Sequence, residues 1–284
     1  MFVADNRLAT AKKYFFEALA AFFSPSECKQ MWLVLLEKRF GWSQAEQMLQ
    51  METRVSESDL LYFRSAVKRL KAQEPFQYIV ADTLFAGLVL KTDKRALIPR
   101  PETEELVALV ANLGVEFKAI IDLCTGSGCI ALALKKKFPN AVVHGLDLSA
   151  DAIALAKENA LQTKLDVEFD VADVLNWNSQ QLFDLIVSNP PYIPSQEKEL
   201  MQANVLDFEP HIALFVPDND PVLFYRRMIQ IAQESLLPEA YLALEIHENF
   251  ALETKALFDG SHFKNVQIHR DLQGKQRMIL AQKV

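Results

Sequence analysis

Apolar residues recur at helical spacing through the first quarter of the chain. The clearest series is Leu8, Tyr14, Phe15, Leu19 and Phe22. Residues 24–27 read Ser-Pro-Ser-Glu, which joins a capping serine to a proline suited to a first helical turn, and Gly41 is placed to end the helix that follows. Two more helices are predicted over residues 43–51 and 56–73. Because no strand pattern occurs in this region, residues 1–74 are expected to form an all-helical domain.

The pattern changes after residue 74. Residues 75–100 mix aromatic, branched and small side chains, with Asp82 and Gly87 as turn candidates, and this predicts a hairpin that links two domains. From residue 101 to 284, strand patterns alternate with helical ones. Strands are predicted at 119–123, 141–148, 167–171, 182–188 and 241–246, with two more around a final glycine turn, and helices at 102–113, 130–138, 150–161 and 221–237. This alternation predicts an α/β domain with a Rossmann-like, mostly parallel, doubly wound sheet of seven strands.

Composition narrows the class of protein. Half of the residues are apolar and 24% are charged, as in ordinary globular proteins, and 284 residues suffice for two domains. The net charge of −7 argues against a protein that coats nucleic acid. The three cysteines form no CxxC pair and the five histidines are scattered, so we expect a reducing, cytoplasmic location and no metal site. No run of 18 apolar residues occurs and the first residues lack the order of a secretory signal, so neither a membrane span nor a signal peptide is expected.

Two glycines follow a buried-strand pattern in AIIDLCTGSGCIALAL, residues 119–134. Gly126 and Gly128 allow the backbone to approach a ligand closely, at the sheet edge where open α/β folds bind ligands. The spacing D-x-C-x-G-x-G differs from the dinucleotide motif G-x-G-x-x-G, and it lacks the Lys-Ser/Thr of a phosphate loop. A phosphate-bearing ligand is therefore not the first expectation.

Two further strand ends carry acidic residues. Asp147 ends the second predicted strand of the sheet, where an acidic side chain can bind both ribose hydroxyls. Asp173 and Val174 follow the third strand and suit the edge and the face of an adenine. The alternative is that the glycines only form a tight turn and that Asp147 caps the next helix. The three strand ends together predict a pocket for a nucleoside without phosphate groups. S-adenosylmethionine is a ligand of this kind.

The stretch VSNPPYIPS, residues 187–195, places an amide, two prolines and an aromatic ring at the end of the fourth strand. Pro190 and Pro191 have fixed φ angles and cannot donate N–H, and a proline keeps its predecessor out of helical geometry. The result is a stiff loop whose backbone carbonyls, with the side-chain carbonyl of Asn189, lack local donors. These carbonyls can accept hydrogen bonds from a substrate NH2 group, and Tyr192 offers a flat ring. The alternative is that this motif is only a rigid turn.

Such an acceptor pair suits methyl transfer to an amide or aryl amine nitrogen. The lone pair of this nitrogen is conjugated, and acceptors that hold its two hydrogens favour a pyramidal, more reactive geometry. They also stabilise the positive charge that develops as the methyl group arrives. Because a sulfonium supplies the driving force, positioning matters more than a strong base, and proton loss can follow methyl transfer. Asn189, Pro190 and Tyr192 are therefore the candidate catalytic residues.

With these motifs in place, the chain resembles the class I methyltransferases and, more narrowly, the HemK/PrmC family, which methylates a glutamine side-chain nitrogen in class I peptide-chain release factors. LIPRPETEELV resembles the entry to the family's catalytic domain, DLCTGSGCIALAL its cofactor loop, and VSNPPYIPS with LDFEPHIALF its substrate loop. NPPY alone is shared with adenine amino-methyltransferases, whereas RPETE, NPPYI and FEP in this order are more specific. The family often has Gly where this chain has Cys124, which weakens the expectation of a positive φ at that position.

The resemblance implies S-adenosylmethionine as the cofactor and S-adenosylhomocysteine as the product. It implies that the cofactor contacts Asp122, Cys124, Thr125, Gly126, Ser127, Gly128, Asp147, Asp173, Val174 and Asn189. The residues implied to hold the substrate glutamine are Asn189, Pro190, Pro191 and Tyr192. No role is assigned to Arg100 and Glu102, because residues around Pro101 suit either the start of a helix or a part in closing the pocket. The role of Glu209 stays open in the same way.

The resemblance also implies that the helical domain holds the release factor. Residues 1–74 contain 11 Lys or Arg against 9 Asp or Glu, whereas the remainder contains 19 against 28, so the helical domain is the less acidic part. Arg64, Lys68 and Lys71 fall at i, i+4 and i+7 on one helix face. They either meet an acidic partner or form an ordinary solvated face.

Three alternative functions stay open. The NPPY loop would equally hold a flipped adenine, although the chain shows neither an insertion for target recognition nor a basic stripe with aromatics, so a nucleic-acid substrate is not expected. A ribosomal-protein glutamine is a second possible methyl acceptor. A nonenzymatic module that retains a nucleoside pocket is the third. The sequence leaves the oligomeric state open, with a monomer as the expectation, and does not choose among release factors.

Overall fold

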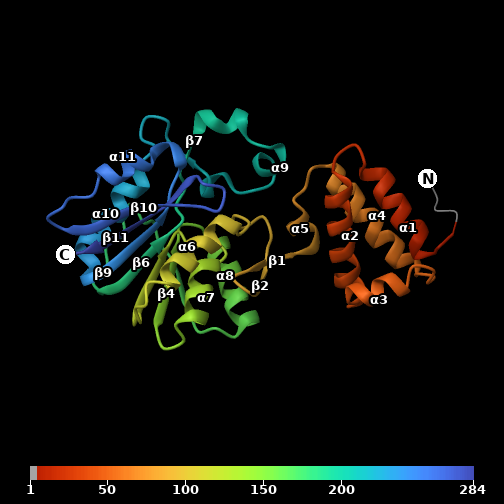
Figure 1. Ribbon diagram of the computed structural model, residues 1–284, viewed down its shortest axis with the longest axis horizontal. Helices are drawn as coiled ribbons and strands as arrows, with labels where there is room; N and C mark the ends of the chain where they lie inside the picture. The colour runs from red at the N-terminus through yellow and green to blue at the C-terminus, as the bar shows by residue number, and fades with distance from the viewer. Residues whose placement is uncertain (1–4) are drawn as a thin grey trace. The chain divides into compact units, whose positions relative to one another are not determined.

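The structure, a computed structural model, describes residues 5–284 and divides them into two compact units (Figure 1). The first unit comprises the chain up to Ala81 together with Ala203–Phe208, and the second comprises Asp82–Gln202 and Glu209–Val284. Residues 1–4, which open the predicted helical domain, lie outside the described residues. The division between the units follows Ala81, later than the predicted boundary at residue 74, and the first unit also recruits a distant segment that sequence periodicity did not assign to it.

The part of the first unit up to Ala81 is built from four helices and one short fifth helix: α1 (Leu8–Leu19), α2 (Pro25–Phe40), α3 (Gln44–Leu49), α4 (Glu57–Lys71) and α5 (Phe76–Val80). Ser24, Ser43 and Ser56 begin α2, α3 and α4, and each forms a capping box with an acidic residue three positions later. Gly41 ends α2 with a φ of 71°. The starts and ends of these helices therefore lie close to the predicted ones, because caps are local signals.

Helix α5 replaces the first part of the predicted hairpin. Phe76–Val80 is helical, and Ala81 ends the helix in the left-handed region with a φ of 61°. Ile79 lies in the apolar core of the helical unit, where Phe76 also packs. This packing overrides the strand preference of aromatic and branched residues. The hairpin is confined to β1 (Asp82–Phe85) and β2 (Leu88–Lys91), which join at two residues with positive φ.

The core of the helical unit is built around aromatic rings. The Trp32 ring lies between Phe15 and Phe63, with ring centroids 5.4 Å and 4.7 Å apart. All three side chains are nearly inaccessible to water. Rings at these separations add attraction to the hydrophobic gain of burying them, so this cluster fixes α1, α2 and α4 against one another.

A seven-stranded sheet forms the centre of the second unit, in the order β10-β11-β9-β6-β3-β4-β5 (Figure 1). The strands are β3 (Ala119–Leu123), β4 (Val142–Asp147), β5 (Glu168–Val171), β6 (Phe183–Ser188), β9 (Leu236–Glu245), β10 (Phe263–Arg270) and β11 (Gln276–Lys283). The strands from β9 to β5 are parallel, and β11 is antiparallel to both of its neighbours. The predicted Rossmann-like, mostly parallel sheet is confirmed. The chain leaves β3 toward β4 on one side and returns to β6 on the other, which creates a topological switch point between β3 and β6.

Helices cover both faces of this sheet. The side chain of Ile120 joins the core beneath α6 (Pro101–Ala111), α7 (Cys129–Lys137) and α8 (Ala150–Thr163). The next residue, Ile121, joins the core beneath α10 (Leu223–Ser235) and α11 (Ala251–Ala256). Side chains alternate across a strand, so a sheet covered on both faces needs continuous apolar runs, as the sequence of β3 and β6 provides.

Short elements connect β6 to α10 and β9 to β10. They are β7 (Ile193–Pro194), β8 (Phe215–Val216), α9 (Ala203–Leu206) and the 3₁₀ turns η1 (Ser195–Leu200), η2 (His211–Ala213) and η3 (Glu248–Phe250). These, and α11, were not predicted, because segments of two to six residues are too short to show a period. Strands β7 and β8 pair in parallel and hold the chain that leaves the NPPY loop beside residues 215–216.

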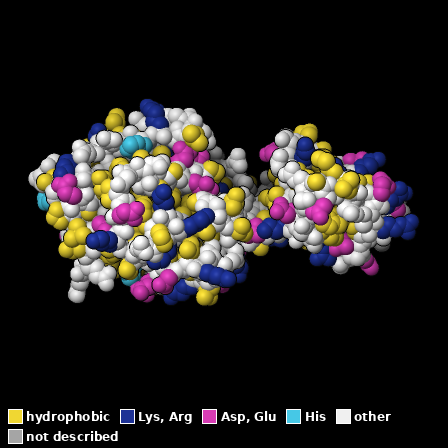
Figure 2. Space-filling view, turned by 60° about the horizontal axis from the view of Figure 1, so that its bottom comes forward, with side chains coloured by type: hydrophobic (Ala, Val, Ile, Leu, Met, Phe, Trp, Pro, Cys, Tyr) yellow, Lys and Arg dark blue, Asp and Glu magenta, His cyan; other side chains and the backbone are white. Residues whose placement is uncertain are grey.

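The surface carries both signs of charge. On the face shown in Figure 2, Lys and Arg side chains are interspersed with Asp and Glu. No helix within residues 5–284 is long and apolar enough to cross a membrane. Within the same residues, no three His, Cys, Asp or Glu side chains gather in a way that could hold a metal ion.

Candidate active site

A cavity of about 190 Å³ opens in the second unit at the carboxyl ends of its central strands. The predicted site residues that line it are Cys124, Thr125, Gly126, Ser127, Asp147, Asp173, Val174, Asn189 and Pro191. Four other predicted residues, Asp122, Gly128, Pro190 and Tyr192, are not part of its wall. The cavity thus lies beside the switch point, where parallel sheets bind ligands, and gathers residues from four separate strand ends.

The glycine turn after β3 is built from left-handed residues. Cys124, Gly126 and Gly128 have φ angles of 61°, 56° and 79°. A Cβ on Gly128 would come within 2.9 Å of the Phe169 ring, so this glycine is required both by its φ and by close packing. Position 124 does adopt positive φ, contrary to the weakened expectation from the sequence. Cys124 thus adopts the left-handed conformation, which is unfavourable for a residue with a Cβ atom.

Asp147 ends β4 and faces the turn. Its Oδ2 accepts a hydrogen bond from the backbone N–H of Gly126 (2.8 Å), and its Oδ1 accepts one from Ser149 (2.9 Å). Burial raises the pKa of Asp147, while these backbone donors act in the opposite direction. The side chain lines the cavity, and a carboxylate has about four lone-pair sites, so it has capacity left to accept from a ligand hydroxyl group.

Asp122 lies beneath the turn and is completely buried. Its Oδ2 accepts hydrogen bonds from Thr125 Oγ1 (2.5 Å) and from the N–H of Ala131 (3.2 Å). Its Oδ1 has no partner among the described residues. Burial raises the pKa of Asp122 to about 7. The carboxyl group supports the turn from below, and its contact with a ligand stays a prediction.

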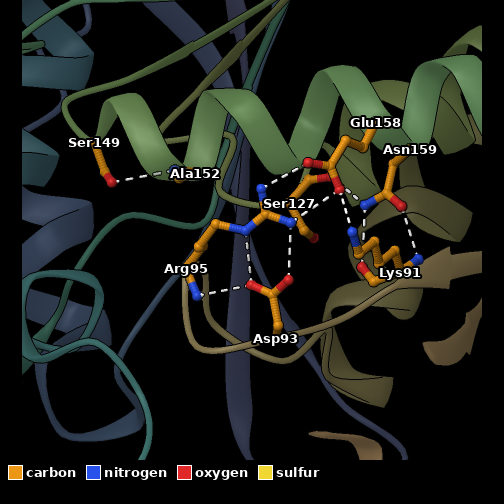
Figure 3. A network of polar contacts seen from close by, with 8 residues as sticks. All are labelled: Lys91, Asp93, Arg95, Ser127, Ser149, Ala152, Glu158 and Asn159. Atoms are coloured by element: carbon orange, nitrogen blue, oxygen red, sulfur yellow. Dashed lines mark hydrogen bonds and ion pairs between the residues drawn. The ribbon is translucent and has the colours of Figure 1, made fainter. Parts of the chain in front are cut away.

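The buried amide of Asn159 joins three segments (Figure 3). It accepts a hydrogen bond from the N–H of Lys91 (2.7 Å) and donates to the carbonyl of the same residue (3.2 Å), as a neighbouring strand would. It also donates to the carbonyl of Ser127 in the glycine turn (3.0 Å). Asn159 therefore ties the hairpin strand β2 and the turn to α8. The sequence singled out neither the residue nor this role.

Two arginines on the cavity wall are neutralised by ion pairs. Arg95 lies between Asp93 and Glu158, with N–O distances of 2.8 Å to each (Figure 3). Arg100 pairs with the buried carboxylate of Glu209 (2.5 Å). Because both guanidinium groups already have anionic partners, the wall offers no free arginine for a phosphate.

Glu209 also shapes the cavity wall. Its Oε2 accepts a hydrogen bond from the N–H of Ile98 (3.0 Å), while its Oε1 binds Arg100. The side chain is 1% exposed. It thereby holds Ile98 and Arg100, which both line the cavity, and of these two only Arg100 had been considered from the sequence for a part in closing the pocket. The F-E-P motif was noted in the sequence, but its partners lie more than a hundred residues away and could not be read from spacing.

The NPPY loop leaves β6 with its acceptors free of protein donors. Asn189 Nδ2 donates to Thr103 Oγ1 (3.1 Å), which turns the amide carbonyl away from Thr103. Neither Pro190 nor Pro191, both buried, accepts a backbone hydrogen bond within the described part of the chain. Asn189 and Pro191 line the cavity, whereas Pro190 lies outside its wall, and none of these acceptors has a hydrogen-bond donor among the described residues.

Tyr192 is anchored behind the cavity. Its hydroxyl donates to Oε1 of Glu245 (3.1 Å), and its ring lies edge-on to His247. Burial, reinforced by the charge of Glu245, raises the pKa of Tyr192 well above its ordinary value, so the phenol stays protonated. Tyr192 is thus positioned to hold the loop, and direct contact of its ring with a substrate stays a prediction.

Thr103 and Glu245 are functional candidates that the sequence did not identify. Thr103 lies in the first turn of α6 and Glu245 at the end of β9, and Thr103 Oγ1 donates to Glu245 Oε2 (2.7 Å). An acidic residue at the end of an apolar strand resembles the arrangement of Asp122 and Asp147. That signal was present in LALEIH, but only the fold shows that β9 lies next to β6.

Comparisons with known proteins extend over both units. Residues 14–80 match the family described as PrmC N-terminal domain, and residues 105–207 match the Methyltransferase small domain. A release factor glutamine methyltransferase from Flavobacterium psychrophilum is 38% identical over 271 residues, covering 93% of this chain and 95% of the relative. A release factor glutamine methyltransferase from Bacteroides thetaiotaomicron is 34% identical over 270 residues, covering 94% and 97%.

Among solved structures, a methyltransferase from Pyrococcus furiosus is similar with a TM-score of 0.54. It shares 19% sequence identity, and the match covers 76% of this chain and 98% of that one. At this identity the likeness establishes the fold only.

Proposed function

The chain belongs to the release factor glutamine methyltransferase family, and on this premise we propose that it methylates a glutamine side-chain nitrogen in class I peptide-chain release factors. The methyl donor of this SAM-dependent enzyme is S-adenosylmethionine. The observation that carries the substrate class is the orientation of Asn189. Its NH2 group is bound to Thr103, so its carbonyl remains for the cavity. An acceptor there selects a donor, and a primary amide provides two N–H groups.

The cavity suits a nucleoside cofactor without phosphate. Asp147 keeps lone pairs for ribose hydroxyls, and Leu148, Val174 and Phe224 supply apolar walls for a base. The Ser127 hydroxyl is buried without a partner among the described residues, so a donor or acceptor on a ligand can satisfy it. Both wall arginines are paired with carboxylates, which leaves neither of them free to bind a phosphate. These residues would therefore hold S-adenosylmethionine.

Transfer of the methyl group requires little acid–base chemistry from the protein. When bound, the cofactor supplies an electrophilic methyl group on a positively charged sulfur. Asn189 Oδ1 and the carbonyl of Pro190 accept the two N–H hydrogens of the substrate amide and aim its nitrogen at the methyl carbon. The cofactor would supply its methyl carbon to the substrate nitrogen, and the same acceptors would stabilise the charge on nitrogen until one proton is lost to water.

The helical unit is proposed to recognise the release factor. Arg64, Lys68 and Lys71 are all exposed on α4. They offer a positive surface to an acidic segment of the substrate. Because release factors act on ribosomes, the proposed substrate places this enzyme in the cytoplasm.

The proposed function is tested by mass spectrometry of a class I release factor after incubation with the purified protein and S-adenosylmethionine. We expect one methyl group on a single glutamine. A release factor with Glu at that position should stay unmodified, because a carboxylate cannot donate to the NPPY carbonyls. Parallel reactions with ribosomal protein and with duplex DNA separate the alternatives. Methylation of either one in preference to the release factor would overturn the proposal.

A further inference from the structure

Glu245 is a buried carboxylate whose two oxygens each have a hydroxyl partner. The side chain is 1% exposed at the end of β9. Oε2 accepts from Thr103 Oγ1 (2.7 Å), and Oε1 accepts from Tyr192 Oη (3.1 Å). The nearby Arg277 forms its ion pair with Asp271 (3.2 Å). Burial of a carboxyl group with only neutral hydrogen-bond donors is unfavourable, so a hydrophobic residue of similar size would serve packing better.

The hydroxyl group of Thr103 connects the Glu245 carboxylate to Asn189 in the NPPY loop. A hydroxyl group has one hydrogen and two lone pairs. Since the hydrogen of Thr103 is directed to Glu245, only its lone pairs remain for Asn189, and these can bind the amide NH2 but not the amide carbonyl. The carboxylate thus determines which end of the Asn189 amide faces the cavity.

Tyr192 connects the same carboxylate to the other end of the NPPY loop. One buried group thereby holds the first and the last residue of the four. Reversal of the Asn189 amide would present N–H donors to a substrate NH2 group, and two donors repel. The arrangement therefore determines whether Asn189 presents an acceptor or a donor to the substrate, as well as the position of the loop.

We infer that Glu245 is a positioning residue for methyl transfer, which keeps Asn189 an acceptor through Thr103 and anchors Tyr192 directly. This inference rests on the proposed function for its kinetic consequence. It does not rest on it for the orientation of Asn189, which belongs to the protein alone.

The kinetic test measures kcat for release factor methylation in Glu245→Gln, made both in the wild-type protein and in a background that lacks its two hydroxyl partners. Glu245→Gln can donate to Thr103 and so permits the amide to reverse. We expect kcat to fall roughly 10- to 100-fold, the loss typical of a hydrogen bond to a charged group, with the dissociation constant of S-adenosylmethionine changed less than about threefold. In a Thr103→Val/Tyr192→Phe background, Glu245→Gln should add no further loss, because both of its routes are already cut. Multiplicative losses, or a near wild-type kcat in the single variant, would overturn the inference.

Two variants of Thr103 test the same connection without a change at Glu245, in case the Glu245 variant misfolds. Thr103→Ser keeps the hydroxyl and should retain kcat within about threefold, whereas Thr103→Val removes it and should lose roughly 10-fold or more. Equal kcat in these two variants would contradict the relay. Asp184→Asn serves as the control, since Asp184 accepts from the backbone N–H groups of Lys118 and Ala119 at the opposite end of the sheet. It should reduce thermal stability and leave kcat unchanged.

A second readout needs no substrate. The side-chain NH2 resonances of Asn189, identified by their disappearance in Asn189→Asp, report on the bond to Thr103. We expect their chemical shift and hydrogen exchange to change in Glu245→Gln and to stay unchanged in Asp184→Asn. Unchanged resonances in Glu245→Gln would refute the inference even if glutamine were not the substrate. If the wild-type protein does not methylate glutamine while the resonances respond, the proposed function fails and the positioning role stands.

Discussion

The side-chain amide of Asn159 donates a hydrogen bond to the carbonyl of Ser127 across 3.0 Å, and so connects α8 to the glycine turn of the cavity. The same amide exchanges two hydrogen bonds with the backbone of Lys91 in β2 (Figure 3). Every polar atom of this buried side chain is therefore used. A turn with three left-handed residues has little regular backbone hydrogen bonding of its own, and Asn159 supplies an external support for it.

Replacement of Asn159 by alanine should destabilise the second unit and weaken cofactor binding. The change leaves the Lys91 N–H and two carbonyl groups without partners, so we expect a loss of about 2–4 kcal/mol in the free energy of unfolding. Urea unfolding and calorimetric titration with S-adenosylmethionine measure the two effects. Gln162→Ala, on the exposed side of the same helix with a single bond to Val89, is the control and should change both much less. Equal effects of the two variants would contradict the role given to Asn159.

Asn189→Ala should remove methyl transfer with a smaller effect on cofactor binding. The variant lacks the acceptor that orients the substrate amide, and loss of one such group lowers kcat by roughly 10²- to 10³-fold. Single-turnover methylation measures the chemical step, and equilibrium titration measures the cofactor. Turnover near that of the wild type would show that the assigned role of Asn189 is wrong.

Asp122 makes stability depend on pH. Burial raises its pKa from 3.8 to about 7, so the folded protein binds this proton more tightly than the unfolded chain. The stabilisation is complete below about pH 4 and is lost as the pH rises toward 7. Asp122→Asn cannot ionise and should therefore gain stability relative to the wild type between pH 4 and 8, by on the order of a few kcal/mol. Denaturant unfolding across this range measures the difference in free energy of unfolding between the two proteins. The contributions of the other carboxylates cancel in this difference, because both proteins contain them. A constant difference would disprove the raised pKa.

Cys124 occupies a backbone conformation that suits glycine. Cys124→Gly relieves a left-handed strain of about 1–2 kcal/mol and adds a similar flexibility to the unfolded chain, so stability should stay within about 1 kcal/mol of the wild type. Cys124→Val puts a branched side chain at the same φ of 61° and should lose more than this. Thermal unfolding of the two variants decides the question. If valine were tolerated as well as glycine, the backbone at position 124 would not be under the constraint described.

The basic surface of α4 predicts a specific kinetic change. Lys68→Glu should raise the KM for the release factor, increasingly at low salt, and leave kcat and cofactor affinity unchanged, because the change alters association and not the cavity. Lys137→Glu, which changes another exposed lysine, at the end of α7, is the matched control. Similar KM values in the two variants would count against a recognition role for this surface.

Much of the fold was predictable because its signals are local. The capping serines of α2, α3 and α4, the continuous apolar run of β3 and the glycines after it all act within a few residues. Helix α5 was mistaken for part of a hairpin because Ile79 packs into the core of the helical unit, and no local pattern announces that contact. The same limit applies to the first unit's recruitment of Ala203–Phe208.

The sequence by itself determined the sheet, the glycine turn and the stiff NPPY loop, since periodicity, φ preference and proline geometry are properties of short segments. Only the tertiary structure decided the polarity of that loop. Asn189 meets Thr103 across 86 positions of the chain, and Thr103 meets Glu245 across 142. An amide has no preferred orientation of its own, so its donor and acceptor ends are assigned by whatever partners the fold brings beside it.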